Sequence, residues 1–185
     1  MKDLKEFDIS FVGLKEGKHY FEYQIEKTFF DYFKFDEYSD ASVKTSLVFF
    51  KKATMLELTF IIDGWVEVAC DITNELFHQP IHDTINLVVK FGEAYNDENE
   101  ELLILSHSDF KMNVAQYIYE GVILGVPLKR IHPGIENGTL KSPVLEKLKE
   151  FEIDHQKNDI ERENDPRWDK LKNILIDKNT SNGAS

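Results

Sequence analysis

The sequence is poor in three features that many protein functions require. It has one cysteine, Cys70, among 185 residues, which excludes a disulfide within the chain and is typical of a reducing compartment. No apolar run approaches the roughly 20 residues of a membrane-spanning helix, and the N-terminal residues lack the apolar segment of a secretory signal. These absences predict a cytoplasmic protein without a membrane segment.

Basic residues are also scarce. Lys and Arg total 22 against 34 Asp and Glu, so the formal net charge is -12. Such a charge repels a phosphate backbone in general, which argues against indiscriminate binding of nucleic acid. Local basic patches and protein partners both remain open.

The motifs of common catalytic sites are missing. The sequence has no Gly-rich phosphate loop, no Gly-x-Ser-x-Gly elbow and no His-Glu-x-x-His helix. Cys70, His78 and His82 invite a metal site, but Pro80 breaks any helix between the histidines. In an extended strand, side chains four residues apart are separated by about 13 Å, too far for one metal ion. We therefore predict no catalytic residue, no cofactor and no metal, and a buried, structural Cys70.

The clearest helix is predicted from Val114 to Gly125. Asn113 followed by Gln116 is the pattern of a capping box, and Pro127 prevents the helix from continuing. Apolar residues recur at helical spacing and are predicted to be buried: Val114, Ala115, Ile118, Val122 and Leu124.

Most of the chain before this helix alternates apolar and polar residues, which predicts about six strands. Residues 7–12 and 19–25 are expected to form a hairpin, and residues 43–70 an antiparallel meander with a tight turn at Asp63-Gly64. A further strand is expected at 81–91, and a surface loop at 92–101. Residues 28–40 show no settled period, so a short helix and an irregular crossing both remain open.

These elements predict an α+β fold for residues 1–149. In it, a curved antiparallel sheet, resembling a partly closed barrel, is covered by the central helix. Residues 150–164 are almost wholly polar and are predicted to be a disordered linker. Residues 165–178 are predicted to form an amphipathic helical tail, and residues 179–185 a disordered end. A lone helix of about three turns is marginal in water, so the tail should dock on its own domain or on a partner.

A short basic segment follows the central helix. Lys129, Arg130 and His132 lie between two prolines that stiffen the backbone. One interpretation is structural, because cations at a helix C-terminus interact favourably with its dipole. The other is a preorganised phosphate contact, with Arg130 as a planar fork and Lys129 as a point charge. Aromatic residues that could stack beside it, or belong to the core, are Tyr20, Tyr23 and Trp65.

Several segments occur in the order and spacing of one protein family. They are Phe-Val-Gly-Leu at 11–14 and the segments 17–23, 68–71, 87–101, 113–133 and 165–171. In these the chain resembles the DUF177 or YceD family of large ribosomal RNA subunit accumulation proteins, in particular the members from Bacteroidetes. The resemblance implies a cytoplasmic, non-enzymatic protein needed for synthesis, processing or stability of 23S rRNA and hence for the large ribosomal subunit.

The chain departs from the family at one motif. Many members carry Cys-x-x-Cys where this chain has Cys70-Asp-Ile-Thr73, so a two-thiol redox or zinc role is closed to these residues. From charge and placement we hypothesise contacts with large-subunit rRNA or its precursor particle at Lys129, Arg130, His132, Arg167 and Trp168. The alternative is an acidic adaptor that holds a basic ribosomal protein without touching RNA. The sequence indicates no oligomeric state.

Overall fold

The structure is a computed structural model that describes residues 4–93, 95–99 and 102–151. The chain divides into two compact units, Met1–His132 and Pro133–Ser185. In chain order the first unit contains η1 (Leu4–Phe7), β1 (Asp8–Ser10), β2 (Gly17–Glu26), α1 (Lys27–Tyr32), β3 (Asp40–Lys51), β4 (Met55–Ala69), β5 (Leu76–Gly92), β6 (Asn96–Asn99), β7 (Leu102–Ser106), β8 (Lys111–Asn113) and α2 (Ala115–Gly125).

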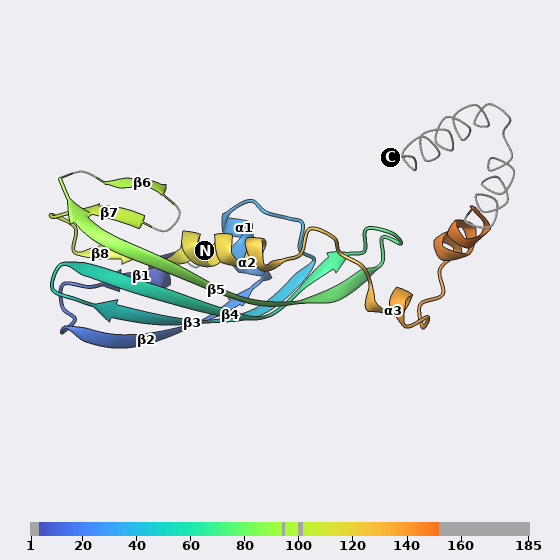
Figure 1. Cartoon of the computed structure of the whole chain (residues 1–185), viewed down its shortest axis with the longest axis horizontal. Helices are drawn as coiled ribbons and strands as arrows, with labels where there is room; N and C mark the ends of the chain where they lie inside the picture. The colour runs from blue at the N-terminus through green and yellow to red at the C-terminus, as the bar shows by residue number, and fades with distance from the viewer. Residues whose placement is uncertain (1–3, 94, 100–101, 152–185) are drawn as a thin grey trace, which may run out of the picture. The chain divides into compact units, whose positions relative to one another are not determined.

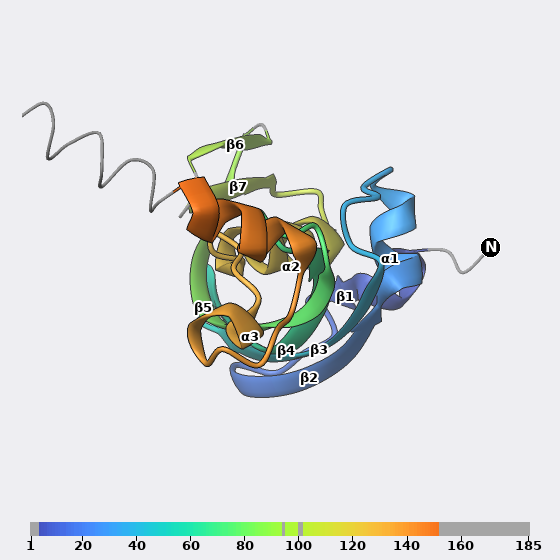
Figure 2. The same cartoon turned by 90° about the vertical axis from the view of Figure 1, so that its right-hand side faces the viewer.

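The main sheet has six strands in the order β2-β3-β4-β5-β7-β6. All neighbouring strands are antiparallel except β5 and β7, which are parallel. Strands β2 to β5 curve around α2, which packs against β4 and β5 (Figures 1 and 2). The predicted α+β fold with a helix over a mainly antiparallel sheet is confirmed. The partly closed barrel is not confirmed, because the edge strands β2 and β6 do not pair with each other in the described part of the chain.

The core forms where the inward-facing residues of the sheet meet α2. Buried and more exposed residues alternate along β3 and β4, as the sequence predicts for strands with one covered face. On α2, Ala115, Ile118 and Val122 are buried, but Leu124 is 77% exposed, so its predicted burial is wrong. Leu124 follows Val122 by two residues, or about 200° around the helix, and therefore faces away from the sheet.

The start of α2 differs from the predicted capping box. The Asn113 side-chain oxygen accepts a hydrogen bond from the Ala115 N–H (2.9 Å), but Gln116 donates to Glu120 (2.8 Å) instead of turning back to Asn113. Asn113 belongs to β8, and its amide nitrogen donates to the Leu4 carbonyl and to Asp8 (2.8 Å each). The residue thus joins the helix start to the N-terminal segment. The predicted helix end before Pro127 is confirmed.

The predicted hairpin between the first two strands is wrong. β1 pairs with β8, with Ile9 opposite Met112, and this pair forms a separate two-stranded sheet. β2 pairs with β3 over its whole length. Ile9 and Met112 are both buried, so the pairing covers two apolar side chains that are far apart in the sequence.

Asp63-Gly64 does not make a turn. β4 runs through both residues, and Gly64 lies opposite Val43 in β3 and Ile81 in β5. Its φ is 152°, and a Cβ atom there would lie 2.7 Å from the Cα of Val43 and closer still to the carbonyl oxygen of Ser42. The glycine therefore permits two strand backbones to approach closely. The two strands predicted on either side of Asp63-Gly64 form the single strand β4.

β5 begins earlier than predicted and includes Pro80, which lies opposite Trp65 of β4. On its other side β5 pairs with β7 only from Val88 to Gly92. Pro80 therefore lies where β5 is an edge strand, and its missing N–H interrupts no second ladder.

The predicted loop at 92–101 contains a short strand, β6, which is antiparallel to β7.

Residues 28–40, which show no clear period in the sequence, contain α1 and an aromatic cluster. Phe30 lies within 5.1 to 6.3 Å of the rings of Phe35, Tyr38 and Tyr119, and Phe33 stacks on Tyr119 with 4.1 Å between ring centroids. Tyr119 belongs to α2, so the aromatic rings attach this segment to the central helix. Contacts between aromatic rings, rather than a regular pattern of apolar residues, hold this segment in place.

The described part of the second unit contains α3 (Pro133–Glu136) and a helical stretch at 143–151. Ser142 begins that stretch, because its carbonyl accepts hydrogen bonds from the N–H groups of Leu145 and Glu146. The rest of the predicted linker, the tail helix at 165–178 and the end at 179–185 lie outside the described residues. The domain boundary at residue 149 stays a prediction. Among the residues that the structure describes, no helix is long and apolar enough to cross a membrane.

Candidate functional site

The predicted basic segment, residues 129–132, lies against the turn that joins β4 to β5. The Asp71 N–H donates to the carbonyl of Arg130 (2.9 Å), and the Arg130 N–H donates to the Asp71 carboxylate (2.7 Å). The His132 N–H donates to the sulfur of Cys70 (3.3 Å), and the His132 ring lies 5.4 Å from that of Phe77. The backbone of the segment is therefore fixed by the 70–71 turn, which precedes it by about sixty residues in the sequence.

The Arg130 guanidinium is shared by two carboxylates. Its Nε lies 3.5 Å from Asp71, one terminal nitrogen lies 3.5 Å from Glu37, and the side chain is 29% exposed. Lys129 is exposed and has no hydrogen bond or ion pair in the described structure. The structure thus brings Arg130 and His132 into one set of contacts, in which Arg130 is largely neutralised by acids of its own chain.

Cys70 lies at the centre of these contacts and is 2% exposed. Burial by itself raises the pKa of the thiol, but the nearby polar groups of Thr73 and the hydrogen bond from the His132 N–H favour the thiolate and leave the pKa below its usual value. A buried sulfur that accepts a backbone hydrogen bond holds the segment in place. This agrees with the structural role predicted for Cys70.

The contacts of the basic segment predict that Asp71→Ala lowers the free energy of unfolding by about 1–2 kcal/mol. The carboxylate binds both the backbone and the side chain of Arg130, so its removal leaves the Arg130 N–H without its acceptor and the guanidinium with Glu37 alone. Urea denaturation of the full chain measures the loss. Lys129→Ala is the matched control and should change stability by less than about 0.5 kcal/mol. Equal losses in the two variants would mean that Asp71 does not hold the segment.

The other residues of interest are spread over the sheet. His78 stacks on Trp65 with 3.8 Å between ring centroids, and its Nε2 lies 3.7 Å from Glu67. His82 lies 3.0 Å from Asp63. Both histidine side chains are more than half exposed, whereas Cys70 is buried. Tyr23 stacks on Phe7, and burial raises the pKa of Tyr23 to about 12, so it is a neutral residue of the fold.

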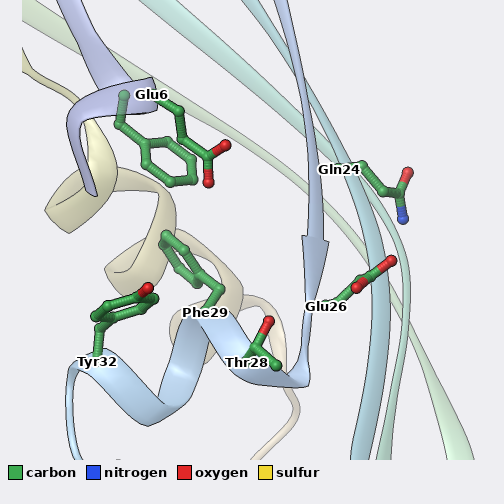
Figure 3. Close-up of a pocket in the computed structure, with 7 residues that line it drawn as sticks. Glu6, Gln24, Glu26, Thr28, Phe29 and Tyr32 are labelled. Atoms are coloured by element: carbon green, nitrogen blue, oxygen red, sulfur yellow. The ribbon is translucent and has the colours of Figure 1, made fainter. Parts of the chain in front are cut away.

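The sequence gives no signal for a hollow of about 130 Å³ between η1, β2 and α1 (Figure 3). Its lining residues are Glu6, Phe7, Gln24, Glu26, Thr28, Phe29 and Tyr32. The carboxylates of Glu6 and Glu26 are exposed, and Tyr32 is 38% exposed, so the hollow combines negative charge with an accessible ring. It lies beside β2, whose second edge has no partner strand in the described chain. These residues come from three elements, and only the tertiary structure collects them.

A comparison with protein families matches residues 58–175 to the family described as large ribosomal RNA subunit accumulation protein YceD. The chain belongs to this family. The YceD match covers most of β4, all of β5 and α2, the basic segment and the residues beyond it as far as 175, including Arg167 and Trp168. Comparisons with curated proteins and with solved structures find no match. The YceD name connects the family with accumulation of large-subunit ribosomal RNA.

Proposed function

We propose that the chain is a non-enzymatic, cytoplasmic factor for accumulation of 23S rRNA, acting in synthesis, processing or stability of that RNA and in large-subunit assembly. The observation that carries this proposal is the YceD match over more than half of the chain. The protein acts by binding, and its partner is the large-subunit rRNA or its precursor particle.

The basic segment supports only a limited contact with RNA. Lys129 is exposed and available to a phosphate, but Arg130 already binds Asp71 and Glu37. A phosphate would have to compete with two carboxylates for the guanidinium. We therefore propose Lys129 as the contact, with Arg130 and His132 as residues that also hold the segment. Arg167 and Trp168 stay predicted contacts.

The alternative function, an adaptor for a basic ribosomal protein, is favoured by the hollow beside β2. The hollow suits the cation of a lysine or arginine side chain, because the Glu6 carboxylate pairs with such a charge and the Tyr32 ring attracts it. The unpaired edge of β2 can accept the backbone of an extended segment next to it. The net charge of -12 adds a general attraction for basic proteins.

Depletion of the protein tests the proposed function. We expect a selective fall in the ratio of 23S to 16S rRNA and in free large subunits, measured by RNA quantification and a sucrose-gradient ribosome profile. Restoration by the wild-type chain is the control. An unchanged ratio and an unchanged profile would contradict a role in the large subunit.

RNA binding then separates the two mechanisms. Direct binding of RNA weakens steeply with salt, because lysine–phosphate contacts release counterions. An adaptor binds no naked RNA and depends on Glu6. Lys129→Glu tests the basic segment better than Arg130→Glu, which would place a third carboxylate beside Asp71 and Glu37 and disturb the fold.

A further inference from the structure

The outer face of the main sheet, which α2 does not cover, has a basic and aromatic patch that the sequence does not reveal. The register places Lys18 of β2 opposite Phe50 of β3, and Tyr20 opposite Val48. Lys90 of β5 lies opposite Met55, at the end of β4 nearest Lys52. Phe49 and Val89, next to these residues in their strands, are buried and face the core. We call Lys18, Tyr20, Phe50, Lys52 and Lys90 the outer-face patch.

Two lysines of the patch flank an aromatic ring. The Nζ atoms of Lys18 and Lys52 lie 5.9 and 5.1 Å from the centroid of the Phe50 ring. Tyr20, two residues along β2 from Lys18, is 72% exposed. A phenol ring on an open sheet face offers a surface on which a nucleic acid base can stack, and the ammonium groups beside it suit phosphates.

The charge of the patch is opposite to that of the whole chain. On the same sheet face Glu57 pairs with Lys52, and Glu22 pairs with Lys44 (2.9 Å). Lys18 and Lys90 have no carboxylate partner within the part of the chain that the structure describes. Two lysine charges thus stay uncompensated, in a protein whose net charge is -12. A polyanion complements this face and is repelled by most of the remaining surface.

A structural reason accounts for part of the pattern. Lysine on an edge strand prevents the pairing of sheet edges, and Lys18 lies on the edge strand β2. Lys90, however, belongs to β5, which pairs with β7 at that residue. Lys90 therefore does not lie on a sheet edge, and edge protection does not explain it. Packing does not explain Tyr20 either. Its ring is the most exposed aromatic side chain of the sheet face, whereas Phe21 and Tyr23 in the same strand face the other side.

We propose that the outer-face patch binds single-stranded RNA, with a base stacked on Tyr20 and phosphates on Lys18 and Lys90. Unpaired bases can lie flat on an aromatic ring, whereas the bases of a duplex are already stacked on each other. This inference rests on the proposed function, because it names the contact through which the factor reaches rRNA. It adds a second contact, on a different surface from Lys129.

Binding of the full chain to a labelled single-stranded 12-nucleotide RNA, followed by fluorescence anisotropy over a range of KCl, tests the proposal. We expect Tyr20→Ala to weaken binding about tenfold or more. We expect the double variant Lys18→Glu with Lys90→Glu to weaken binding further. The slope of log affinity against log salt concentration should also fall by an amount that corresponds to about one to two phosphate contacts. A 12-base-pair RNA duplex should bind more weakly than the single strand.

Two matched variants serve as controls, and urea denaturation shows whether each variant is folded. Tyr32→Ala removes a partly exposed aromatic residue from the hollow of Figure 3, and Lys147→Glu reverses the charge of an exposed lysine in the helical stretch at 143–151. Both should leave binding within about twofold of wild type. The proposal is overturned if the wild-type chain binds no single-stranded RNA at low salt, if the duplex binds as well, or if Lys129→Glu abolishes binding while Tyr20→Ala does not.

The cellular and biochemical experiments distinguish failure of the patch proposal from failure of the proposed function. If depletion lowers 23S rRNA but the protein binds no single-stranded RNA, the patch proposal fails and the assembly function stands. If Tyr20→Ala lowers 23S rRNA in cells without any RNA binding in vitro, the patch contacts a protein, which also overturns the RNA proposal. If RNA binding depends on Tyr20 but depletion leaves 23S rRNA unchanged, the patch stands and the proposed function fails.

Discussion

Gly64→Ala should lower the free energy of unfolding by at least about 3 kcal/mol. The added Cβ would lie against the backbone of Ser42 and Val43 in the neighbouring strand, and the φ of 152° is one that alanine rarely adopts. Relief would require β3 and β4 to separate, although the two strands stay paired on both sides of this point. Urea denaturation of the full chain at equilibrium measures the effect.

Gly121→Ala is the matched control for Gly64. Its Cβ would meet the tips of two side chains, Ile62 and Ile85, which can rotate, and alanine favours a helix over glycine by about 1 kcal/mol. The net change should therefore stay within about 1 kcal/mol of wild type. If Gly64→Ala proved as mild as Gly121→Ala, the close approach of β3 and β4 at Gly64 would be wrong.

Phe60→Ala should cost about 3–5 kcal/mol of unfolding free energy, the usual loss when a fully buried ring is truncated. Phe60 has no exposed surface, lies on the inner face of β4, and stacks on Tyr117 of α2 with 6.3 Å between ring centroids. Its removal would leave a cavity between the sheet and the helix that covers it. The midpoint of urea denaturation should fall accordingly.

Ile61→Ala tests the direction of the same strand. Ile61 is the next residue along β4 but is 39% exposed on the outer face, so its truncation should cost about 1 kcal/mol or less. A loss for Ile61→Ala as large as that for Phe60→Ala would show that the strand faces the other way. The pair therefore checks the alternation on which the outer-face patch also depends.

The sequence could predict which residues of each strand face the core, because side-chain direction in a strand alternates with a period of two and needs only local information. Val43, Leu47 and Phe49 are buried as their pattern predicts. The end of α2 was equally predictable, because Pro127 cannot continue a helix. The family was recognisable from the order of several short segments, and the match over residues 58–175 confirms it.

Strand partners could not be predicted in the same way. Alternation shows that β1 is a strand but not that it pairs with β8, about one hundred residues later, because pairing is decided by which apolar surfaces cover each other in the folded chain. Asp63-Gly64 is a turn dipeptide when considered alone. The contacts of Gly64 with β3 show that the glycine instead permits two backbones to approach closely.

The sequence by itself determined the strand faces, the central helix and the family, while the tertiary structure decided where charge is available. Lys129, Arg130 and His132 form a basic cluster in the sequence, but Asp71 and Glu37 neutralise Arg130 from distant positions. Lys18, Lys52 and Lys90 look unrelated in the sequence, yet β2 to β5 bring them to one face. Electrostatic interactions depend on distance in space, so only the folded chain shows which charges cancel and which remain.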